Sequence, residues 1–221
     1  MKLQNYVPAK ISLTLIIAIL IFVVGLFFYF TKESAVTKTA IPNVKPLIIF
    51  VGPGQNLPID APKDSRFANF AVVIPKILSR SGQPSIEDFK YLSKNGWKGV
   101  VDLRQDGEMG EVSDDSKIPG FDNLNFNYIN LQIVDGLTPT VGQAREFLRF
   151  VNNPKNQPVH VHCAYGIGRA GLMVALYRYS VQSWPMDKAI EESRLFSGGV
   201  DEAQAKWLES WAKDHEPGSF K

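Results

Sequence analysis

The chain has 221 residues, of which 45% are hydrophobic, and its formal net charge is only +2. A chain of this length usually forms one domain, and the small net charge without any Lys/Arg cluster argues against nucleic-acid binding. Its single cysteine, Cys163, excludes an internal disulfide bond, so the fold must depend on its apolar core.

Residues 11–30 form a continuous apolar stretch with no charged side chain. As a helix, this stretch reaches about 30 Å, which is the thickness of the hydrocarbon core of a bilayer. A cleavable signal peptide has a shorter apolar stretch, of about 7–15 residues, and ends in a small-residue cleavage site. Residues 31–36 contain no clear site of that kind. We therefore predict a transmembrane anchor at residues 11–30, preceded by an N-terminal tail at residues 1–10.

The charges on either side of this anchor give only a small preference for one orientation in the membrane. Lys2 and Lys10 precede it, and Lys32, Lys38 and Lys45 follow it, so the positive-inside rule favours neither side strongly. The very short N-terminal tail is typical of a signal anchor with its tail in the cytosol. We therefore expect a single-pass membrane protein whose domain lies on the exported, periplasmic or extracytoplasmic, side.

Residues 31–66 contain several prolines and two glycines, which disfavour regular structure. They are predicted to be a spacer between the anchor and a folded domain. Within this spacer, the apolar residues 47–51 indicate either a short strand or a docking segment.

Residues 67–221 show the alternating strand and helix patterns of a globular domain. Helices are expected where Ser85 and Thr140 provide N-caps, and also after the loop that ends at Arg169, where the sequence is apolar on most sides. The predicted strands are 72–74, 77–78, 98–103, 126–131 and 159–162; the predicted helices are 85–95, 140–151, 169–182, 186–196 and 201–215; residues 107–123 are expected to be a long loop. This alternation predicts an α/β fold with a mainly parallel central sheet flanked by helices on both faces.

The segment that joins the last predicted strand to the apolar helix has the composition of an anion-binding loop. Glycines let the backbone turn so that N–H groups point inward, and the helix N-terminus adds a positive dipole. An arginine supplies a planar fork for two phosphate oxygens, and the positive field favours the thiolate form of the cysteine. The predicted phosphate-binding loop consists of His162, Cys163, Ala164, Tyr165, Gly166, Ile167, Gly168 and Arg169.

Each part of this loop has a simpler explanation on its own. A lone cysteine at a strand end is more often a small core residue. His160 and His162 hint at a metal site, but the only other histidine is His215 and the sequence shows no matching acidic cluster. We therefore predict neither a metal nor a cofactor. The combination of strand, His-Cys, two glycines, Arg and apolar helix favours phosphate chemistry with Cys163 as nucleophile.

The pattern His162-Cys163-x5-Arg169 resembles the signature of the protein tyrosine phosphatase superfamily, in its compact dual-specificity branch. Upstream, residues 79–84 and 100–104 are also similar to bacterial dual-specificity-like phosphatases, so the resemblance covers roughly residues 67–215. It implies a mainly parallel sheet with the loop at the carboxyl end of a strand. It also implies hydrolysis of phosphomonoesters through a phosphocysteine intermediate.

The same resemblance implies an aspartate on a mobile loop that protonates the leaving oxygen and then activates water. Asp135 follows a predicted strand and precedes a helix, and Gly136 suits a loop that moves. The alternative for Asp135 is a simple turn with Gly136. Asp106 is the second candidate for the acid, whereas Asp102 is expected inside a strand and Arg104 in a structural ion pair.

One position departs from the family pattern. Ala170 stands directly after Arg169, where the family usually has Ser or Thr. That hydroxyl normally stabilises the departing thiolate, so its absence predicts slow breakdown of the phosphocysteine. Gln204 is a further candidate, as a residue that places the hydrolytic water, although a glutamine near the last helix is more often a surface residue.

The expected substrates are phosphoproteins carrying phosphorylated Tyr, Ser or Thr. The membrane anchor leaves a lipid or sugar phosphate as an alternative, but the variable loop positions contain no lysine that would bind a polyphosphoinositide head group. A different class of function is a phosphate-binding pseudophosphatase scaffold at the membrane. Retention of Cys163, Arg169 and Asp135 argues against the scaffold.

Overall fold

The structure is a computed structural model that describes residues 49–51, 67–108 and 114–220. The predicted tail at 1–10, the predicted anchor at 11–30 and the predicted spacer at 31–66, apart from residues 49–51, lie outside the described residues. Within the described part of the chain, no helix is long and apolar enough to cross a membrane.

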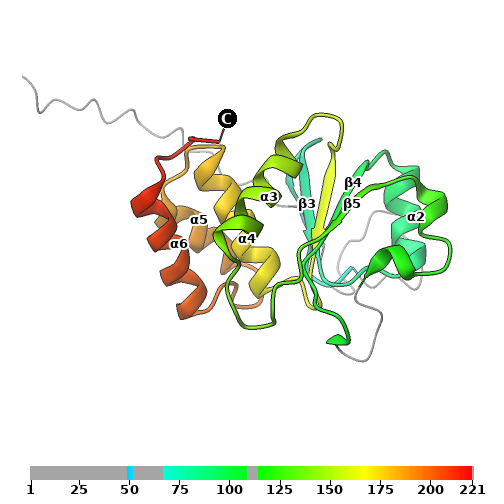
Figure 1. The fold of residues 1–221 in the computed structure, drawn as a ribbon, viewed down its shortest axis with the longest axis horizontal. Coiled ribbons are helices and arrows are strands. Elements are labelled where there is room, and N and C mark those ends of the chain that lie inside the picture. The colour runs from blue at the N-terminus through cyan, green and yellow to red at the C-terminus, as the bar shows by residue number, and fades with distance from the viewer. Residues whose placement is uncertain (1–48, 52–66, 109–113, 221) are drawn as a thin grey trace, which may run out of the picture. The chain divides into compact units, whose positions relative to one another are not determined.

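A sheet forms the centre of the described domain (Figure 1). It has six strands in the order β1-β2-β3-β6-β4-β5. Its strands are β1 (Ile49–Val51), β2 (Phe70–Ile74), β3 (Leu78–Ser81), β4 (Gly99–Asp102), β5 (Asn127–Asn130) and β6 (Val159–His162). The neighbours β3, β6, β4 and β5 pair in parallel, whereas β1–β2 and β2–β3 pair antiparallel. The predicted mainly parallel sheet is therefore confirmed.

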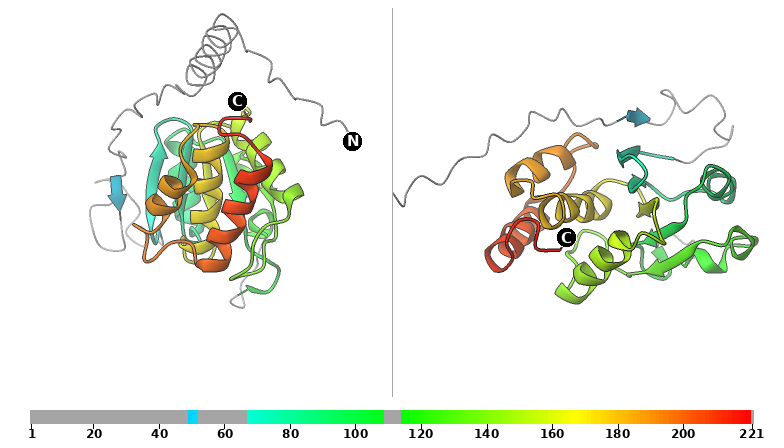
Figure 2. Two further views of the ribbon diagram at one scale, coloured as in Figure 1. Left: turned by 90° about the vertical axis from the view of Figure 1, so that its left-hand side faces the viewer. Right: turned by 90° about the horizontal axis from the view of Figure 1, so that it is seen from above.

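Helices cover both faces of this sheet, as predicted. On one face lie α3 (Val141–Asn152), α4 (Gly168–Ser180), α5 (Met186–Ser193) and α6 (Glu202–Asp214), and on the other lies α2 (Ile86–Lys94) (Figure 1). The view from above in Figure 2 shows the same separation of the helices by the sheet. Each face has its own apolar core, and Val101 packs into the larger core while its neighbour Val100 packs beneath α2.

Capping explains where most of the helices begin. Capping boxes join Ser85 to Asp88 in α2 and Thr140 to Gln143 in α3, and Asp201 caps α6 in the same way. These side chains satisfy backbone N–H groups that have no partner inside the helix. Helix α4 is different, because almost all of its residues are buried, which agrees with the apolar pattern of its sequence.

Three segments differ in detail from the sequence prediction. The strand predicted at residues 77–78 begins at Leu78 and continues to Ser81 as β3. The strand β1 lies inside the predicted spacer and pairs with β2, so this part of the spacer extends the sheet. The predicted loop at residues 107–123 contains two short 3₁₀ turns, η2 (Asp115–Lys117) and η3 (Asp122–Leu124).

The parallel strands bring their carboxyl ends to one edge of the sheet, where the site lies. In register, Ser81 of β3 lies beside His162 of β6, His162 lies beside Asp102 of β4, and Asp102 lies beside Asn130 of β5. The loops that follow these four residues therefore meet at the same edge.

Candidate active site

The loop after β6 turns around the sulfur of Cys163, which is only 2% exposed. The backbone N–H of Gly166 donates to Sγ of Cys163 at 3.2 Å. The loop then enters α4 at Gly168, so the sulfur lies beside the N-terminus of a buried helix, as the sequence predicted. Backbone N–H groups near the sulfur create a positive environment that suits a thiolate and an anion.

Gly166 is the residue that permits this close turn. Its φ is +68°, and a Cβ at this position would lie 2.3 Å from the backbone nitrogen of Gly82 and 2.4 Å from the carbonyl carbon of Ser81. Distances this short are incompatible with any side chain. The loop therefore packs directly onto the backbone that follows β3.

The N-terminus of α4 has no side-chain cap, unlike α2, α3 and α6. The first N–H groups of a helix have no partner within it. Together with the helix dipole, such groups are well suited to bind a phosphate.

Arg169 is buried next to this helix start, and its guanidinium is held by several partners. Nη1 donates to the carbonyl of Ile133 at 3.0 Å and to Glu108 Oε2 at 2.6 Å. Nη2 donates to the other oxygen of Glu108 and lies 3.0 Å from Oδ1 of Asp135. The Nε atom is buried without a hydrogen-bond partner among the described residues, so it can donate to a bound anion.

The structure brings Asp135, the predicted proton donor, to this arginine. Its side chain is 63% exposed and contacts Arg169, and it precedes Gly136, which has a φ of +71°. Asp106, the second candidate, instead lies 4.0 Å from the ammonium group of Lys117. The geometry therefore favours Asp135 as the carboxyl group that can reach a phosphate ester bound at Arg169.

Glu108 is a residue of the site that the sequence analysis missed. Burial raises its pKa, but the hydrogen bonds and charge of Arg169 outweigh burial and lower the pKa below its usual value. A carboxylate with a lowered pKa is a poor proton donor. Glu108 therefore orients Arg169, and only its position two residues after Asp106 in a polar loop could have drawn attention to it.

His162, the first residue of the predicted phosphate-binding loop, does not donate into that loop. Its Nε2 lies 2.6 Å from Oδ2 of Asp115, and its Nδ1 is buried without a hydrogen-bond partner among the described residues. Burial lowers the pKa of His162, but Asp115 and Asp102 outweigh burial and raise it. Its ring therefore belongs to a buried network of charged side chains behind Cys163.

Arg104 completes this network and confirms its predicted structural role. Its Nη2 lies 3.0 Å from Oδ2 of Asp102 and 2.9 Å from Oδ1 of Asp115. Asp102 lies at the end of β4, as expected. The conclusion that no acidic cluster accompanies the histidines was wrong, because Asp115 comes from a loop without a regular pattern.

Among the described residues, Asp102, Asp115 and His162 have ligand atoms within 4.8 Å of one another, close enough to hold a metal ion. Arg104 donates to both carboxylates, so the charge of a metal would be placed beside a guanidinium. These residues therefore fit an ion-pair network better than a metal site. His160 is also engaged, with Nδ1 at 2.8 Å from Ser79 Oγ and Nε2 at 2.9 Å from Ser81 Oγ.

Gln204 is buried, so its interpretation as a surface residue was wrong. Its side-chain amide donates to the carbonyl of Leu137 at 3.3 Å, and a Cβ on Gly168 would lie 3.1 Å from its Oε1. Gln204 therefore links the loop of Asp135 to the start of α4.

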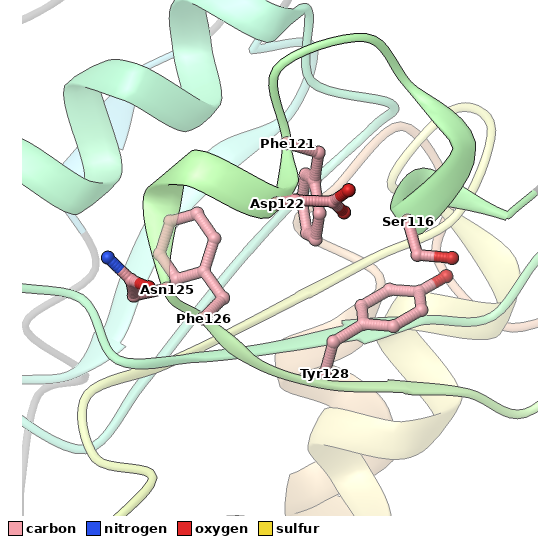
Figure 3. Close-up of a pocket in the computed structure, with 6 residues that line it drawn as sticks. All are labelled: Ser116, Phe121, Asp122, Asn125, Phe126 and Tyr128. Carbon is pink, nitrogen blue, oxygen red and sulfur yellow. The ribbon is translucent and has the colours of Figure 1, made fainter.

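A shallow pocket of about 440 Å³ lies near α2, on the face of the sheet that this helix covers (Figure 3). Its lining residues come from η2, η3 and β5 and their connections: Ser116, Phe121, Asp122, Asn125, Phe126 and Tyr128. None of the predicted catalytic residues lines it.

Comparisons with known proteins show what the chain is similar to. The PTP-NADK family, a DSP-PTPase phosphatase fused to NAD+ kinase, matches residues 62–210. Probable NAD kinase 2, chloroplastic, of Oryza sativa subsp. japonica is 28% identical over 106 residues, which are 46% of this chain and 10% of that protein. The putative tyrosine-protein phosphatase OCA1 of Meyerozyma guilliermondii is 28% identical over 132 residues, which are 57% of this chain and 70% of that protein.

Among solved structures, PTPMT1 in complex with PI(5)P has the same fold, with a TM-score of 0.55 at 22% identity. The match covers 62% of this chain and 91% of that chain. The match spans only a tenth of the length of the rice relative. Because the family match covers residues 62–210, well over half of its length, the chain belongs to the PTP-NADK family of dual-specificity-type protein tyrosine phosphatase domains.

Proposed function

We propose that this chain hydrolyses phosphomonoesters through a phosphocysteine intermediate, with Cys163 as nucleophile, Arg169 as phosphate ligand and Asp135 as general acid. The observation that carries the proposal is the geometry of the loop. The sulfur of Cys163 accepts a hydrogen bond from the N–H of Gly166. Arg169 is held by Glu108, and its buried Nε has no hydrogen-bond partner among the described residues. This arrangement supports binding of a dianion above a thiolate.

In the first step, the thiolate of Cys163 attacks phosphorus and forms the S–P bond. The bond between phosphorus and the ester oxygen breaks, and Asp135 gives its proton to the departing oxygen. Arg169 and the loop N–H groups stabilise the charge on the other phosphate oxygens. Asp135 gives up its contact with Nη2 of Arg169 when a phosphate oxygen takes that position.

In the second step, water attacks phosphorus on the side opposite the sulfur. The carboxylate of Asp135 accepts the proton of that water, the S–P bond breaks and inorganic phosphate leaves with the thiolate restored. We propose that Gln204, which lies near Gly168 and donates to the carbonyl of Leu137, orients this water. Ala170 offers no hydroxyl to the departing thiolate, so we expect this second step to be the slower one.

We propose phosphoproteins as the substrates. The variable loop positions Ala164, Tyr165 and Ile167 carry no cation, and the other charged groups on Arg169 are the carboxylates of Glu108 and Asp135. A substrate with several phosphates would need more cations than this site offers. The name of OCA1 as a tyrosine-protein phosphatase supports the same choice.

A lipid or sugar phosphate is the alternative substrate class, and the structure of PTPMT1 with PI(5)P favours it. The apolar stretch at residues 11–30 also favours it, because an anchored domain meets lipid head groups at high local concentration. A pseudophosphatase scaffold is the alternative without catalysis, and the loss of the hydroxyl at Ala170 is the observation in its favour.

We also propose that residues 11–30 anchor the chain as a single-pass membrane protein with the phosphatase domain on the exported side. The charge-free length of that stretch and the short tail before it support this proposal. Carbonate extraction of membranes and protease treatment of intact cells test it. Release of the full chain by carbonate contradicts the anchor, and protection from external protease contradicts the orientation.

The catalytic proposal is tested on the full chain in detergent under reducing conditions, with an aryl phosphate as substrate. Cys163→Ser is expected to abolish turnover, and Asp135→Ala to reduce it by about 10²–10⁴-fold. Absence of turnover in the wild-type chain rejects the enzyme and favours the pseudophosphatase scaffold. Turnover that persists in Cys163→Ser excludes the phosphocysteine mechanism.

The substrate class is then decided by competition. Cys163→Ser still binds a phosphate but cannot form the S–P bond, so it serves as a substrate trap. We expect phosphopeptides to bind the trap more tightly than vesicles containing monophosphorylated lipid. Tighter binding to the lipid vesicles overturns the choice of phosphoproteins.

A further inference from the structure

Arg80 lies behind the phosphate-binding loop, and the mechanism above does not use it. It belongs to β3, which pairs in parallel with β6, and its side chain is fully buried, with 0% exposure. Its Nη2 donates to the carbonyl of Gly166 and, at 3.2 Å, to the carbonyl of Ile167. Arg80 therefore contacts the loop on the backbone of two adjacent residues.

These carbonyls matter because a trans peptide group points its N–H and its C=O in opposite directions. A loop that turns its N–H groups toward an anion must turn the matching carbonyls away from it. Buried carbonyls that point away need donors of their own. Gln83 N–H donates to the carbonyl of Ala164 at 3.0 Å, and Arg80 serves Gly166 and Ile167. Residues 80–83 thus bind three carbonyls of the loop.

Arg80 is also a buried cation without a carboxylate beside it. Among the described residues it forms no ion pair, and its Nε and Nη1 have no hydrogen-bond partner. The ring of Phe196 lies under its guanidinium, with the centroid 3.9 Å from Cζ. Glu192 forms an ion pair with Arg178 instead, with 2.7 Å between its Oε1 and Nη2 of Arg178. A buried charge of this kind is costly unless negative charge lies within reach.

The negative charges that act on Arg80 are those of Cys163, inside the site, and of Glu192, which is already paired with Arg178. Burial lowers the pKa of Arg80 to about 10, while the negative charges of Cys163 and Glu192 act in the opposite direction. Arg80 is therefore still a cation at neutral pH. A thiolate, and then a bound phosphate, would add compensation beyond that of Glu192.

We propose that Arg80 is a positioning residue for the phosphate-binding loop and a second, buried cation of the anion site. It acts through its hydrogen bonds to the carbonyls of Gly166 and Ile167, which point away from the anion. This inference rests on the proposed function in that it concerns the same site. Its test needs no turnover, because both the ionisation of the cysteine and the binding of an anion are measured directly.

The test uses Arg80→Met, which removes the charge, and Arg80→Lys, which keeps the charge but loses the planar fork. The matched control is Arg178→Lys, because Arg178 is also buried and stacked on a ring, that of Trp184, but does not contact the loop, and a lysine keeps a positive charge beside Glu192. Cys163 is the only cysteine, so its alkylation by iodoacetamide can be followed by the mass of the full chain.

We expect Arg80→Met to move the midpoint of the alkylation-versus-pH curve upward by about one pH unit, through loss of a nearby positive charge. Tungstate, an unreactive phosphate analogue, should protect Cys163 with an affinity weakened about tenfold or more in both Arg80 variants. Arg80→Lys should keep most of the wild-type midpoint. Arg178→Lys should keep both the midpoint and the tungstate affinity, even if its melting temperature falls.

The proposal is overturned if both Arg80 variants keep the wild-type midpoint and the wild-type tungstate affinity. If an Arg80 variant does not fold, as judged by thermal unfolding, Phe196→Leu takes its place. It removes the ring beneath the guanidinium and should weaken tungstate protection in the same direction. Unchanged protection in Phe196→Leu then counts against the proposal. Wild type that binds tungstate but has no phosphatase activity contradicts only the proposed function.

Discussion

Arg169 is held by Glu108 along one edge of its guanidinium. Both oxygens of the carboxylate accept from the two terminal nitrogens, and the carbonyl of Ile133 accepts from Nη1 as well. The fork of a free arginine rotates about several bonds, and that freedom is lost when it binds an anion. Glu108 therefore removes much of this loss before the substrate arrives.

Replacing Glu108 with Gln tests this role. The amide keeps the shape but loses the charge and one acceptor, and a charge-assisted hydrogen bond contributes about 1.5–3 kcal/mol. We expect kcat/KM for an aryl phosphate to fall by about 10–150-fold. Glu87→Gln is the control, because Glu87 pairs with Lys90 on the exposed surface. Equal activity in the Glu108 variant and wild type would contradict a positioning role.

The lowered pKa of Glu108 also predicts a pH dependence. A carboxyl group whose pKa is lower in the folded state than in the unfolded state stabilises the fold above the unfolded value. That stabilisation is lost as the pH falls through the lowered folded value. The difference in unfolding free energy between wild type and Glu108→Gln should therefore shrink in acid, which urea titrations at several pH values would measure.

Ala170→Ser tests the slow second step. Ala170 is fully buried directly after Arg169, and a serine there places a hydroxyl at the start of α4. One hydrogen bond to the departing thiolate contributes about 1 kcal/mol, so phosphoenzyme breakdown should accelerate by about fivefold. Rapid-quench measurements should show a burst of leaving group in wild type that is smaller in the variant. Unchanged turnover would contradict the role given to the missing hydroxyl.

At the scale of elements, the loop and the end of β3 are packed backbone against backbone. A Cβ on Gly166 would lie within 2.4 Å of Ser81 and Gly82, so Gly166→Ala must displace one of the two segments. We expect loss of tungstate binding and of most phosphatase activity. Gly96→Ala is the matched control, since Gly96 also has a positive φ, +90°, but a Cβ there meets nothing within 4 Å. It should lose only about 1–2 kcal/mol of stability.

The network behind Cys163 joins three elements, because His162 ends β6, Asp102 ends β4 and Asp115 begins η2. The raised pKa of His162 means that the folded state holds its proton more tightly than the unfolded state. Its stabilisation is fully present below about pH 6.5, the unfolded value, and is lost as the pH rises through the folded value. This network should therefore stabilise the folded state more strongly below neutral pH than above it.

Asp115→Asn should reveal that dependence. Breaking a buried pair costs about 3–5 kcal/mol, so the variant is expected to be less stable at pH 5.5 by about that amount. The difference from wild type should shrink toward pH 9, as measured by urea unfolding. His160, whose pKa burial keeps well below its usual value, is present in both proteins and so cancels. A difference that stays constant across this pH range would contradict the assignment of the effect to His162.

At the scale of the whole molecule, the order of elements and the parallel sheet could be predicted from sequence. Ser85 and Thr140 marked helix starts through local capping, and the apolar pattern marked α4 as buried. The prediction worked because these signals depend on neighbouring residues. The strand β1 lay inside a proline-rich stretch, and its assignment was left open because pairing with β2 is a contact between distant segments.

The phosphate-binding loop could be predicted from sequence, but the side chains that hold it in place could not. Cys163, Gly166 and Arg169 lie within one short segment, so their arrangement follows from local sequence. Glu108 and Asp115 come from a polar loop, and their partners lie 61 and 47 residues further along the chain. Only the parallel order of the strands brings them together. Sequence patterns of short range carry no signal for such contacts.

Arg169 connects loops from several parts of the sheet, because it donates to the carbonyls of Leu103, after β4, and Ile133, after β5. An anion bound to Arg169 and to the loop after β6 should therefore stabilise the whole domain. A ligand at 100 times its Kd stabilises the folded state by about 2.7 kcal/mol. For a domain of this size, that corresponds to a rise in melting temperature of about 5–10 °C.

This rise should depend on the loop and not on the chemistry of the sulfur. With saturating tungstate, thermal unfolding of Cys163→Ser should shift nearly as much as wild type, because the N–H groups and Arg169 remain. Arg169→Met should show no shift, since the fork that joins the anion to Leu103 and Ile133 is gone. Arg149→Met, on the exposed face of α3, should shift like wild type and excludes a general effect of charge. An equal shift in Arg169→Met would mean that tungstate binds elsewhere.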